Sequence, residues 1–112
     1  MKFHYKKYGP GVLRPVIPIE LSHSGKTLVY EVLVDSGADM CIFDAQVGEV
    51  LGIDIKKGHK GLVGGWPFEI QAGFLPQMAG LGYGVVGQKG FFDNFIIKFD
   101  LLKEEIVLKP RT

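Results

Sequence analysis

The sequence predicts a single domain built mostly of β-strands, and three observations lead to this prediction. Chain breakers are frequent, because 16 of the 112 residues are glycine and 6 are proline, and this favours short strands and tight turns over long helices. Apolar residues make up 46% of the chain, as in ordinary folded proteins. Several segments alternate apolar and polar side chains with a period of two, which is typical of strands. Because neither a linker nor an internal repeat divides the sequence, residues 1–112 are expected to form one domain.

The first half of the chain is expected to contain a hairpin. Residues 12–21 (VLRPVIPIEL) are predicted as a strand, and the two prolines in them favour a sheet edge or a terminal arm. Residues 22–26 have turn chemistry, and residues 27–34 (TLVYEVLV) end in the continuous apolar run of a buried strand. Residues 1–11, with their three lysines, are expected to be a solvated tail or arm.

A short helix is expected in the middle of the chain. Residues 40–43 (MCIF) are predicted as a short apolar strand that leads into it. Asp44 is a suitable N-cap for a two-turn helix over residues 45–51, because its carboxylate can accept hydrogen bonds from free N–H groups. Gly52 can end that helix in the left-handed conformation.

The remaining elements follow from the same kinds of pattern. Three strand or hairpin segments are expected after the helix: a strand starting at residues 53–55, a glycine-rich hairpin tip at residues 61–66 and an alternating strand over residues 68–72. The chain then runs through a loop at residues 79–84 into a short helical turn near residues 90–95. The last element is a hairpin that pairs residues 96–100 with residues 105–108.

The composition argues against several classes of partner. The net charge is +1, with 13 basic and 12 acidic residues mixed along the chain, so neither nucleic acid nor an anionic membrane surface is an expected partner. The chain contains no run of about 20 apolar residues that could cross a bilayer. His4, His23 and His59 lie far apart, so neither a metal nor another cofactor is expected. The single cysteine, Cys41, cannot form an internal disulfide, which fits a cytoplasmic location.

Asp35 occupies a position that needs a chemical explanation. It follows the apolar run of residues 32–34, where desolvation of a carboxylate is costly unless it has partners. A tight turn through Ser36 and Gly37 can direct backbone N–H groups and a hydroxyl toward the carboxylate, and glycine permits this close approach because it has no Cβ. On these grounds alone, the tripeptide fits either a catalytic site or an ordinary structural turn.

Two motifs at opposite ends of the chain favour the catalytic interpretation. Residues 32–39 (VLVDSGAD) resemble the active-site loop of retroviral-type aspartic proteases, the retropepsin-like family. Residues 83–87 (YGVVG), followed by residues 90–93 (GFFD), resemble the second signature of that family, in which two apolar residues and a glycine precede a short helix. Two signatures in the correct order are more specific than either one alone.

The resemblance extends over roughly residues 12–108 and implies a fold. Residues 14–18 (RPVIP) and 51–53 (LGI) look like the corresponding segments of single-domain prokaryotic members. The fold implied is all-β, a closed β-barrel of the acid-protease type with one or two short helices.

The resemblance also implies an activity, that of an aspartic endopeptidase acting on a peptide or protein substrate, with Asp35 as its catalytic carboxylate. In this family two neighbouring carboxylates share one proton, and the pair activates water for peptide-bond hydrolysis. The chain contains only one motif of this type, so the second carboxylate would come from a second copy in a two-fold homodimer.

Roles for the surrounding residues follow from the same resemblance. Ser36 would bridge the two active-site loops, and Gly37 and Ala38 would flank the substrate backbone. Asp39 would bind the substrate main chain or a basic partner, and an ordinary turn role for it is equally open. Further substrate-binding residues are expected in a flap and in the second signature: Leu62, Val63, Gly64, Gly65, Trp66, Val85 and Val86. The alternative for the flap is a plain hairpin with Trp66 in the core.

The sequence departs from the family pattern at two places. Residues 65–85 are shorter than in the family by about one strand or hairpin arm, which implies either a reduced flap or the lack of a segment that other members have. Family members often carry an arginine after the second signature, where it pairs with acidic residues near the active-site loop, but this chain has Gln88 and Lys89. Lysine can supply charge but not a bidentate fork, so a weakened or absent interaction is expected there.

Two alternatives to a protease stay open from the sequence. The first is a non-catalytic domain of the same fold that serves dimerisation or peptide binding, and the shortened flap favours it. The second is a small-ligand barrel unrelated to proteolysis, which only the glycine-rich β composition supports. The intact residues 35–38 favour the protease over both.

Overall fold

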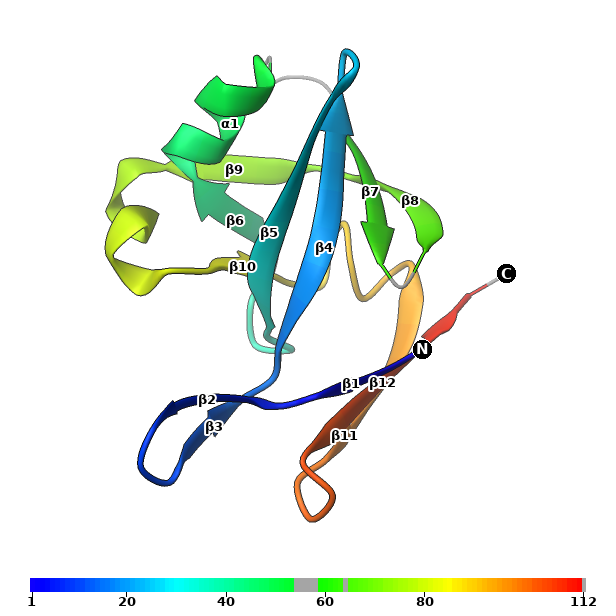
Figure 1. Cartoon of the computed structure of the whole chain (residues 1–112). Coiled ribbons are helices and arrows are strands. Elements are labelled where there is room, and N and C mark those ends of the chain that lie inside the picture. The colour runs from blue at the N-terminus through cyan, green and yellow to red at the C-terminus, as the bar shows by residue number, and fades with distance from the viewer. Residues whose placement is uncertain (54–58, 64, 112) are drawn as a thin grey trace.

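The computed structural model of the chain describes residues 1–53, 59–63 and 65–111, and it confirms a mostly β architecture (Figure 1). The strands, in chain order, are β1 Lys2–His4, β2 Lys6–Gly9, β3 Val12–Arg14, β4 Val16–His23, β5 Lys26–Val34, β6 Cys41–Asp44, β7 His59–Val63, β8 Trp66–Ile70, β9 Ala72–Leu75, β10 Gly84–Val86, β11 Phe95–Asp100 and β12 Glu105–Pro110. The helices are α1 Ala45–Leu51 and the 3-10 helix η1 Pro76–Leu81. Within the described ranges, none of the helices has the length and apolar character needed to span a membrane.

The described strands form three sheets. The largest has seven strands in the order β8-β7-β4-β5-β10-β6-β9, while β1-β12-β11 and β2-β3 form smaller sheets that extend below it in Figure 1. Hydrogen bonds between these strands do not join the sheets into the closed barrel that the resemblance implied. Side chains close the core instead, because Phe95, Ile106 and Leu108 from the β11–β12 hairpin pack in one cluster with residues of β4 and β5.

The β4–β5 hairpin forms as expected, but its first strand lies inside the sheet. Strand β4 pairs with β5 along its whole length and also with β7 at Glu20–Ser22, so the predicted edge strand or terminal arm is wrong for this segment. Pro18 is tolerated because it lies outside the part of β4 that pairs with β7. The turn is a tight one with positive φ at Ser24 (48°) and Gly25 (79°), as in the type I′ turns that match strand twist.

Helix α1 confirms the predicted boundaries. The Asp44 carboxylate accepts a hydrogen bond from the backbone N–H of Gln46 (3.1 Å), which satisfies a free donor at the helix start. Gly52 ends the helix with φ 65°, in the left-handed region. Val47 and Leu51 face the core, so the helix is held by its apolar side.

The second half of the chain matches the prediction in most places. The alternating strand expected over residues 68–72 is present as β8, which ends at Ile70, and the closing β11–β12 hairpin is also present. Strand β9 was not predicted, and η1 occupies part of the expected loop over residues 79–84. Near residues 90–95 the chain makes turns, including a bond from the N–H of Asn94 to the carbonyl of Phe91 (2.9 Å). Residues 1–11 contain β1 and β2, and β1 is antiparallel to β12. The predicted strand start at Ile55 lies outside the described residues.

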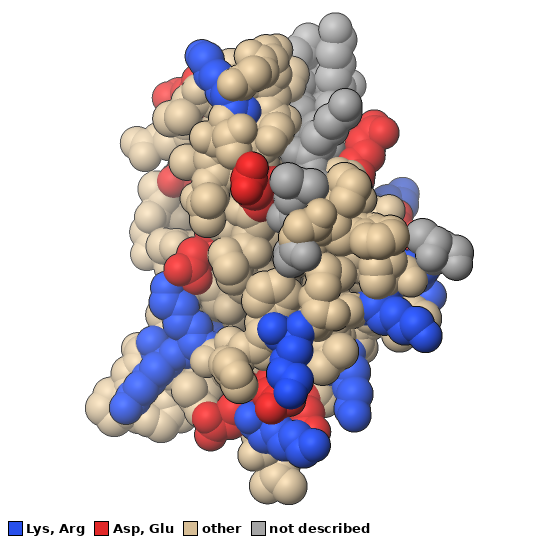
Figure 2. Space-filling view, turned by 45° about the vertical axis from the view of Figure 1, so that its right-hand side comes forward, with Lys and Arg blue, Asp and Glu red and all other residues tan. Residues whose placement is uncertain are grey.

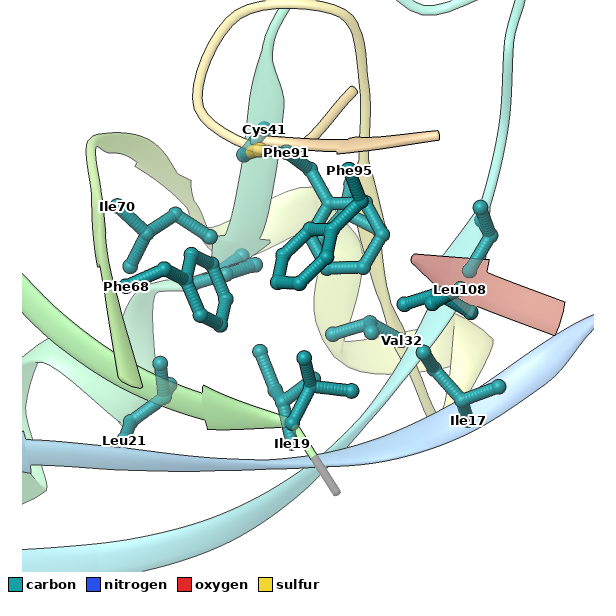
Figure 3. Packing of buried hydrophobic residues seen from close by; sticks show 14 of the residues in the cluster. Ile17, Ile19, Leu21, Val32, Cys41, Phe68, Ile70, Phe91, Phe95 and Leu108 are labelled. Atoms are coloured by element: carbon teal, nitrogen blue, oxygen red, sulfur yellow. The ribbon is translucent and has the colours of Figure 1, made fainter. Parts of the chain in front are cut away.

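A cluster of three phenylalanines fills the core behind the second signature. Phe68, Phe91 and Phe95 lie with ring centroids 5.1 to 5.7 Å apart, and Figure 3 shows them facing Ile19 of β4. Such pairs contribute about 0.5–1.5 kcal/mol each beyond the burial of their surface. Because Phe91 is fully buried, the turn that carries it is fixed against the core, close to Cys41 in Figure 3.

Candidate active site

The structure brings the two sequence signatures side by side. Strand β10 runs parallel to β5, with Gly84 opposite Val32 and Val86 opposite Val34. Asp35 directly follows β5 and Gly87 directly follows β10, so both loops leave the sheet at the same edge. Residues 46 to 52 positions apart in the sequence therefore form one site.

Backbone hydrogen bonds join the Asp35 loop, defined as residues 35–41, to the segment of residues 86–89. Three of them run between the two: Asp35 N–H to the Val86 carbonyl (3.0 Å), Gln88 N–H to the Ala38 carbonyl (2.9 Å) and Lys89 N–H to the Asp39 carbonyl (3.0 Å). A further bond inside the loop runs from the Ala38 N–H to the Asp35 carbonyl (3.2 Å). The loop is thus attached along most of its length.

Gly87 is the point of closest approach between the two segments. A Cβ atom at this position would lie 2.5 Å from the carbonyl oxygen of Ala38 and 2.6 Å from that of Met40. Real Cβ atoms do not approach backbone atoms this closely, so the site accepts only glycine here. Steric constraints therefore explain why the second signature of this chain has a glycine at position 87.

The Asp35 carboxylate is held by its own loop. Its Oδ1 atom accepts a hydrogen bond from the backbone N–H of Gly37 (2.9 Å), and such a charge-assisted bond orients the carboxylate. Asp35 is half-buried, whereas Ser36 and Gly37 are exposed. The carboxylate thus lies at a surface that a substrate or a second copy of the chain can reach.

Cys41 supports the site from the core side. Its side chain is fully buried. The Sγ atom accepts a hydrogen bond from the backbone N–H of Gly87 (N to Sγ 3.5 Å), and the thiol donates one to the carbonyl oxygen of Lys89 (3.4 Å). Burial raises the pKa of the Cys41 thiol to about 11, although the Gly87 N–H acts in the opposite direction. The thiol therefore stays protonated and unreactive near neutral pH, and its two hydrogen bonds were not visible from the sequence.

Gln88 contacts the Asp35 loop through its side chain. Its Nε2 donates to the carbonyl of Ser36 (3.0 Å), at the place where the family pattern has an arginine. The expectation of a weakened or absent interaction concerned pairing with an acidic residue. In the structure, the Gln88 side-chain amide instead forms a hydrogen bond with the backbone of the Asp35 loop. The sequence analysis missed this contact because it considered only the charge at this position.

The expected flap residues lie in and around the β7–β8 hairpin. Val63 is fully buried, whereas Trp66 is 42% exposed, so the alternative that placed Trp66 in the core does not hold. Val63 pairs with Trp66 across the turn, and Gly65 has φ 80°. Gly64 lies outside the described residues, and Leu62 is placed only by its backbone pairing. In the sheet, β4 separates β7 from β5, so the hairpin is not a hydrogen-bonded neighbour of the Asp35 loop.

The remaining expected site residues are placed as follows. Val85 is half-buried and Val86 fully buried in β10, where Val86 lies beside the start of the Asp35 loop. Asp39 is exposed, and its carbonyl is engaged by Lys89.

An aromatic and basic cluster lies next to the start of β10. The guanidinium of Arg14 is 5.1 Å from the ring centre of Tyr8 and 5.9 Å from that of Tyr83, and it donates to the Tyr83 hydroxyl (3.3 Å). These contacts fix the β2–β3 hairpin against Tyr83. Sequence analysis did not identify this cluster, because Tyr83 lies 69 residues from Arg14 in the sequence.

Charge is spread over the molecule without a single dominant sign. Figure 2 shows Lys and Arg side chains sharing the lower half of one face with Asp and Glu side chains. Among the residues that the structure describes, no group of three or more His, Cys, Asp or Glu side chains is placed to hold a metal ion.

The described strands form a mostly β, retropepsin-like fold in which the two signatures lie side by side. The chain is similar to the crystal structure of the retroviral protease-like domain of Ddi1 from Leishmania major, with a TM-score of 0.58 and 15% sequence identity over 91% of this chain and 96% of that chain. At this identity the likeness shows a shared fold. No protein-family model matches the chain, and no curated protein matches it by sequence.

Proposed function

We propose that the protein is an aspartic endopeptidase that is active as a homodimer. The observation that carries this proposal is the position of Asp35. Its carboxylate follows the buried end of β5, accepts a hydrogen bond from the N–H of Gly37 (2.9 Å) and lies beside the glycine signature of β10, within a retropepsin-like fold. An ordinary structural turn does not require an accessible carboxylate to be held by these hydrogen bonds.

In this proposal the two copies contribute one Asp35 each to a shared pair. Two close carboxylates cannot both ionise cheaply, so the pair holds one proton. The ionised member removes a proton from a water, which attacks the scissile carbonyl carbon, while the protonated member donates to the carbonyl oxygen. Collapse of the tetrahedral intermediate then breaks the C–N bond, and a proton from the pair passes to the leaving amine.

The neighbouring residues have supporting roles in this mechanism. Ser36 would bridge the two loops, while Gly37 and Ala38 would lie along the substrate backbone. Val85 and Val86, with the β7–β8 hairpin as a reduced flap, would provide apolar contacts and exclude water. The proposal also includes a cytoplasmic location and kinship with single-domain prokaryotic members of the family.

The test is cleavage of a peptide library by purified protein between about pH 3.5 and about pH 7. Asp35→Asn should abolish turnover, and a statine-type transition-state mimic should inhibit it. Asp100→Asn is the matched control, because Asp100 caps the distant β11–β12 turn through Lys103 N–H (3.0 Å) and asparagine can keep that bond.

Two outcomes separate the proposal from its alternatives. Activity that depends on Asp35 and rises faster than linearly with protein concentration would support a dimeric protease. A folded dimer that cleaves none of the library, and whose Asp35→Asn variant still binds peptides, would favour a non-catalytic peptide-binding module.

A further inference from the structure

We infer that Gln88 is a positioning residue that holds the Asp35 carboxylate through a single peptide group. This inference rests on the proposed function, because it assigns a role within the same site. The hydrogen bond of the Gln88 side chain goes to the Ser36 carbonyl and not to the Asp35 carboxylate.

The connection runs through the peptide bond between Ser36 and Gly37. The Gln88 Nε2 donates to the carbonyl oxygen of Ser36 (3.0 Å). The N–H of the same peptide group belongs to Gly37, and it donates to Asp35 Oδ1 (2.9 Å). One planar unit therefore accepts a hydrogen bond from Gln88 and passes one on to the carboxylate.

Two physical effects make this arrangement more than a surface contact. A peptide group is planar, so a rotation that releases the Ser36 carbonyl from Gln88 also turns the Gly37 N–H away from Asp35. In addition, a hydrogen bond accepted by a carbonyl polarises the peptide and makes its N–H a better donor. Gln88 thus fixes both the direction and the strength of the bond to Asp35.

The backbone of Gln88 is itself held in place. Its N–H donates to the Ala38 carbonyl (2.9 Å), and its carbonyl accepts from the Asp93 N–H (3.1 Å). The preceding Gly87 packs closely against the loop, because a Cβ atom added to it would lie only 2.5 and 2.6 Å from backbone oxygens of the loop. The side-chain amide is therefore presented from a fixed base, although the side chain is exposed.

The alternative is that Gln88 makes an incidental exposed contact of little consequence. Exposed polar contacts are often of this kind, with a small net contribution to stability. The two interpretations differ in what they predict for the Gly37 N–H, whose hydrogen bond goes to Asp35 and not to Gln88. A relay changes the environment of the Gly37 N–H when Gln88 is altered, whereas an incidental contact leaves it unchanged.

The decisive variant is Gln88→Glu, which keeps the shape of the side chain but replaces the donor with a carboxylate that repels the Ser36 carbonyl. The Gly37 amide should then exchange its hydrogen about five- to tenfold faster, and its proton resonance should move upfield, because one hydrogen bond weakens. The kcat for peptide cleavage should fall about tenfold, with KM changed less than about twofold, because the carboxylate is misoriented while binding contacts remain.

Three companion variants make the test specific. Gln77→Glu in η1 introduces the same change at another exposed glutamine, and it should alter neither Gly37 nor kcat. Gln88→Arg restores a donor at this position and should recover most of kcat. Gln88→Asn keeps the amide but is one methylene shorter, so it should behave like Gln88→Glu and provides a second variant if Gln88→Glu does not fold.

The Gly37 measurements do not depend on enzymatic activity. Unchanged Gly37 exchange and resonance in folded Gln88→Glu and Gln88→Asn would overturn the inference, whatever the activity. If the unaltered protein cleaves no peptide while Gly37 responds to Gln88→Glu, the proposed protease fails and the positioning of Asp35 by Gln88 stands.

Discussion

The Asp35 loop and the β7–β8 hairpin are both expected to meet substrate, yet they are held in different ways. The loop is joined to residues 86–89 by three backbone hydrogen bonds, and Gly87 packs closely against the loop's carbonyl groups. The strands of the hairpin are joined to the sheet through three residue pairs between β4 and β7, and Val63, Phe68 and Ile70 are buried in the core. At its turn, Trp66 is 42% exposed.

This difference matches the demands that the proposed function places on the two regions. A catalytic carboxylate must be held within a fraction of an ångström of its working position, so dense bracing serves it. An element that admits and covers a substrate must move, and such elements come from the less stable parts of a structure. The comparison therefore predicts that equivalent substitutions cost far more in the loop than in the hairpin.

The largest effect is expected from Gly87→Ala. The added methyl group would meet backbone oxygens that cannot move independently, so we expect a loss of about 3 kcal/mol or more in the free energy of unfolding. Gly65→Ala in the hairpin is the matched change: nothing lies within 4 Å of its Cβ position, so only the left-handed φ should count, at about 1 kcal/mol. Denaturant unfolding of both variants measures the difference. Equal losses would contradict the comparison.

A smaller loss is expected from Cys41→Ala. The change removes the acceptor of the buried Gly87 N–H, and leaving such a donor unsatisfied costs about 1–3 kcal/mol. Cys41→Ser keeps an acceptor and a donor of shorter reach, so it should lose less than the alanine variant. Chemical denaturation at pH 7 ranks them, and an alanine variant as stable as the parent protein would show that the sulfur contacts contribute nothing.

The Cys41 thiol should also make stability depend on pH. Its pKa is raised in the folded protein from 9.0 to about 11, so the folded state holds its proton more firmly than the unfolded state. This contribution to stability is complete below pH 9 and is lost as the pH rises toward 11. Tyr5, Tyr8 and Tyr30 have pKa values raised by burial and act in the same direction above pH 10.

The test compares unfolding at pH 8 and at pH 10 in the parent protein and in Cys41→Ala. The parent should lose more stability between the two conditions, because only it has the thiol, while the tyrosines are common to both. Identical losses would show that the thiol titrates normally.

The smallest effect on stability is expected from Trp66→Ala. Since the side chain is 42% exposed, the free energy of unfolding should change by less than about 1.5 kcal/mol. Under the proposed function, KM for peptide cleavage should rise several-fold, because an apolar cover over the substrate is lost. A variant with unchanged KM would remove Trp66 from the substrate site while leaving Asp35 unaffected.

Local patterns in the sequence predicted the elements that local physics determines. The strand into Asp35, the Asp44 cap and the Gly52 stop each depend on neighbours within a few residues, and all three were confirmed. The interior position of β4 was missed because its prolines favour an edge, and only the pairing register shows that Pro18 avoids the β7 side.

The contacts around the site were harder to predict for a related reason. The bond from Gln88 to Ser36 and the two bonds of Cys41 depend on the parallel pairing of β10 with β5. That pairing can be inferred from a family resemblance but not from periodicity. The family pattern also directed attention to the charge at positions 88 and 89, whereas the structure uses an amide and a backbone N–H there.

The hydrogen bonds between the Asp35 loop and residues 86–89 also determine when the site can form during synthesis. The side-chain bonds linking the two signatures close sequence separations of 46 to 52 residues, and such non-local contacts form slowly because ordering the intervening chain costs entropy. A ribosome adds about 5–20 residues per second, so the loop waits several seconds for its partner segment to emerge. A nascent or truncated chain that ends before residue 86 lacks the residues that hydrogen-bond to the Asp35 loop. Under the proposed function, such a chain should have no protease activity until the second signature is synthesised.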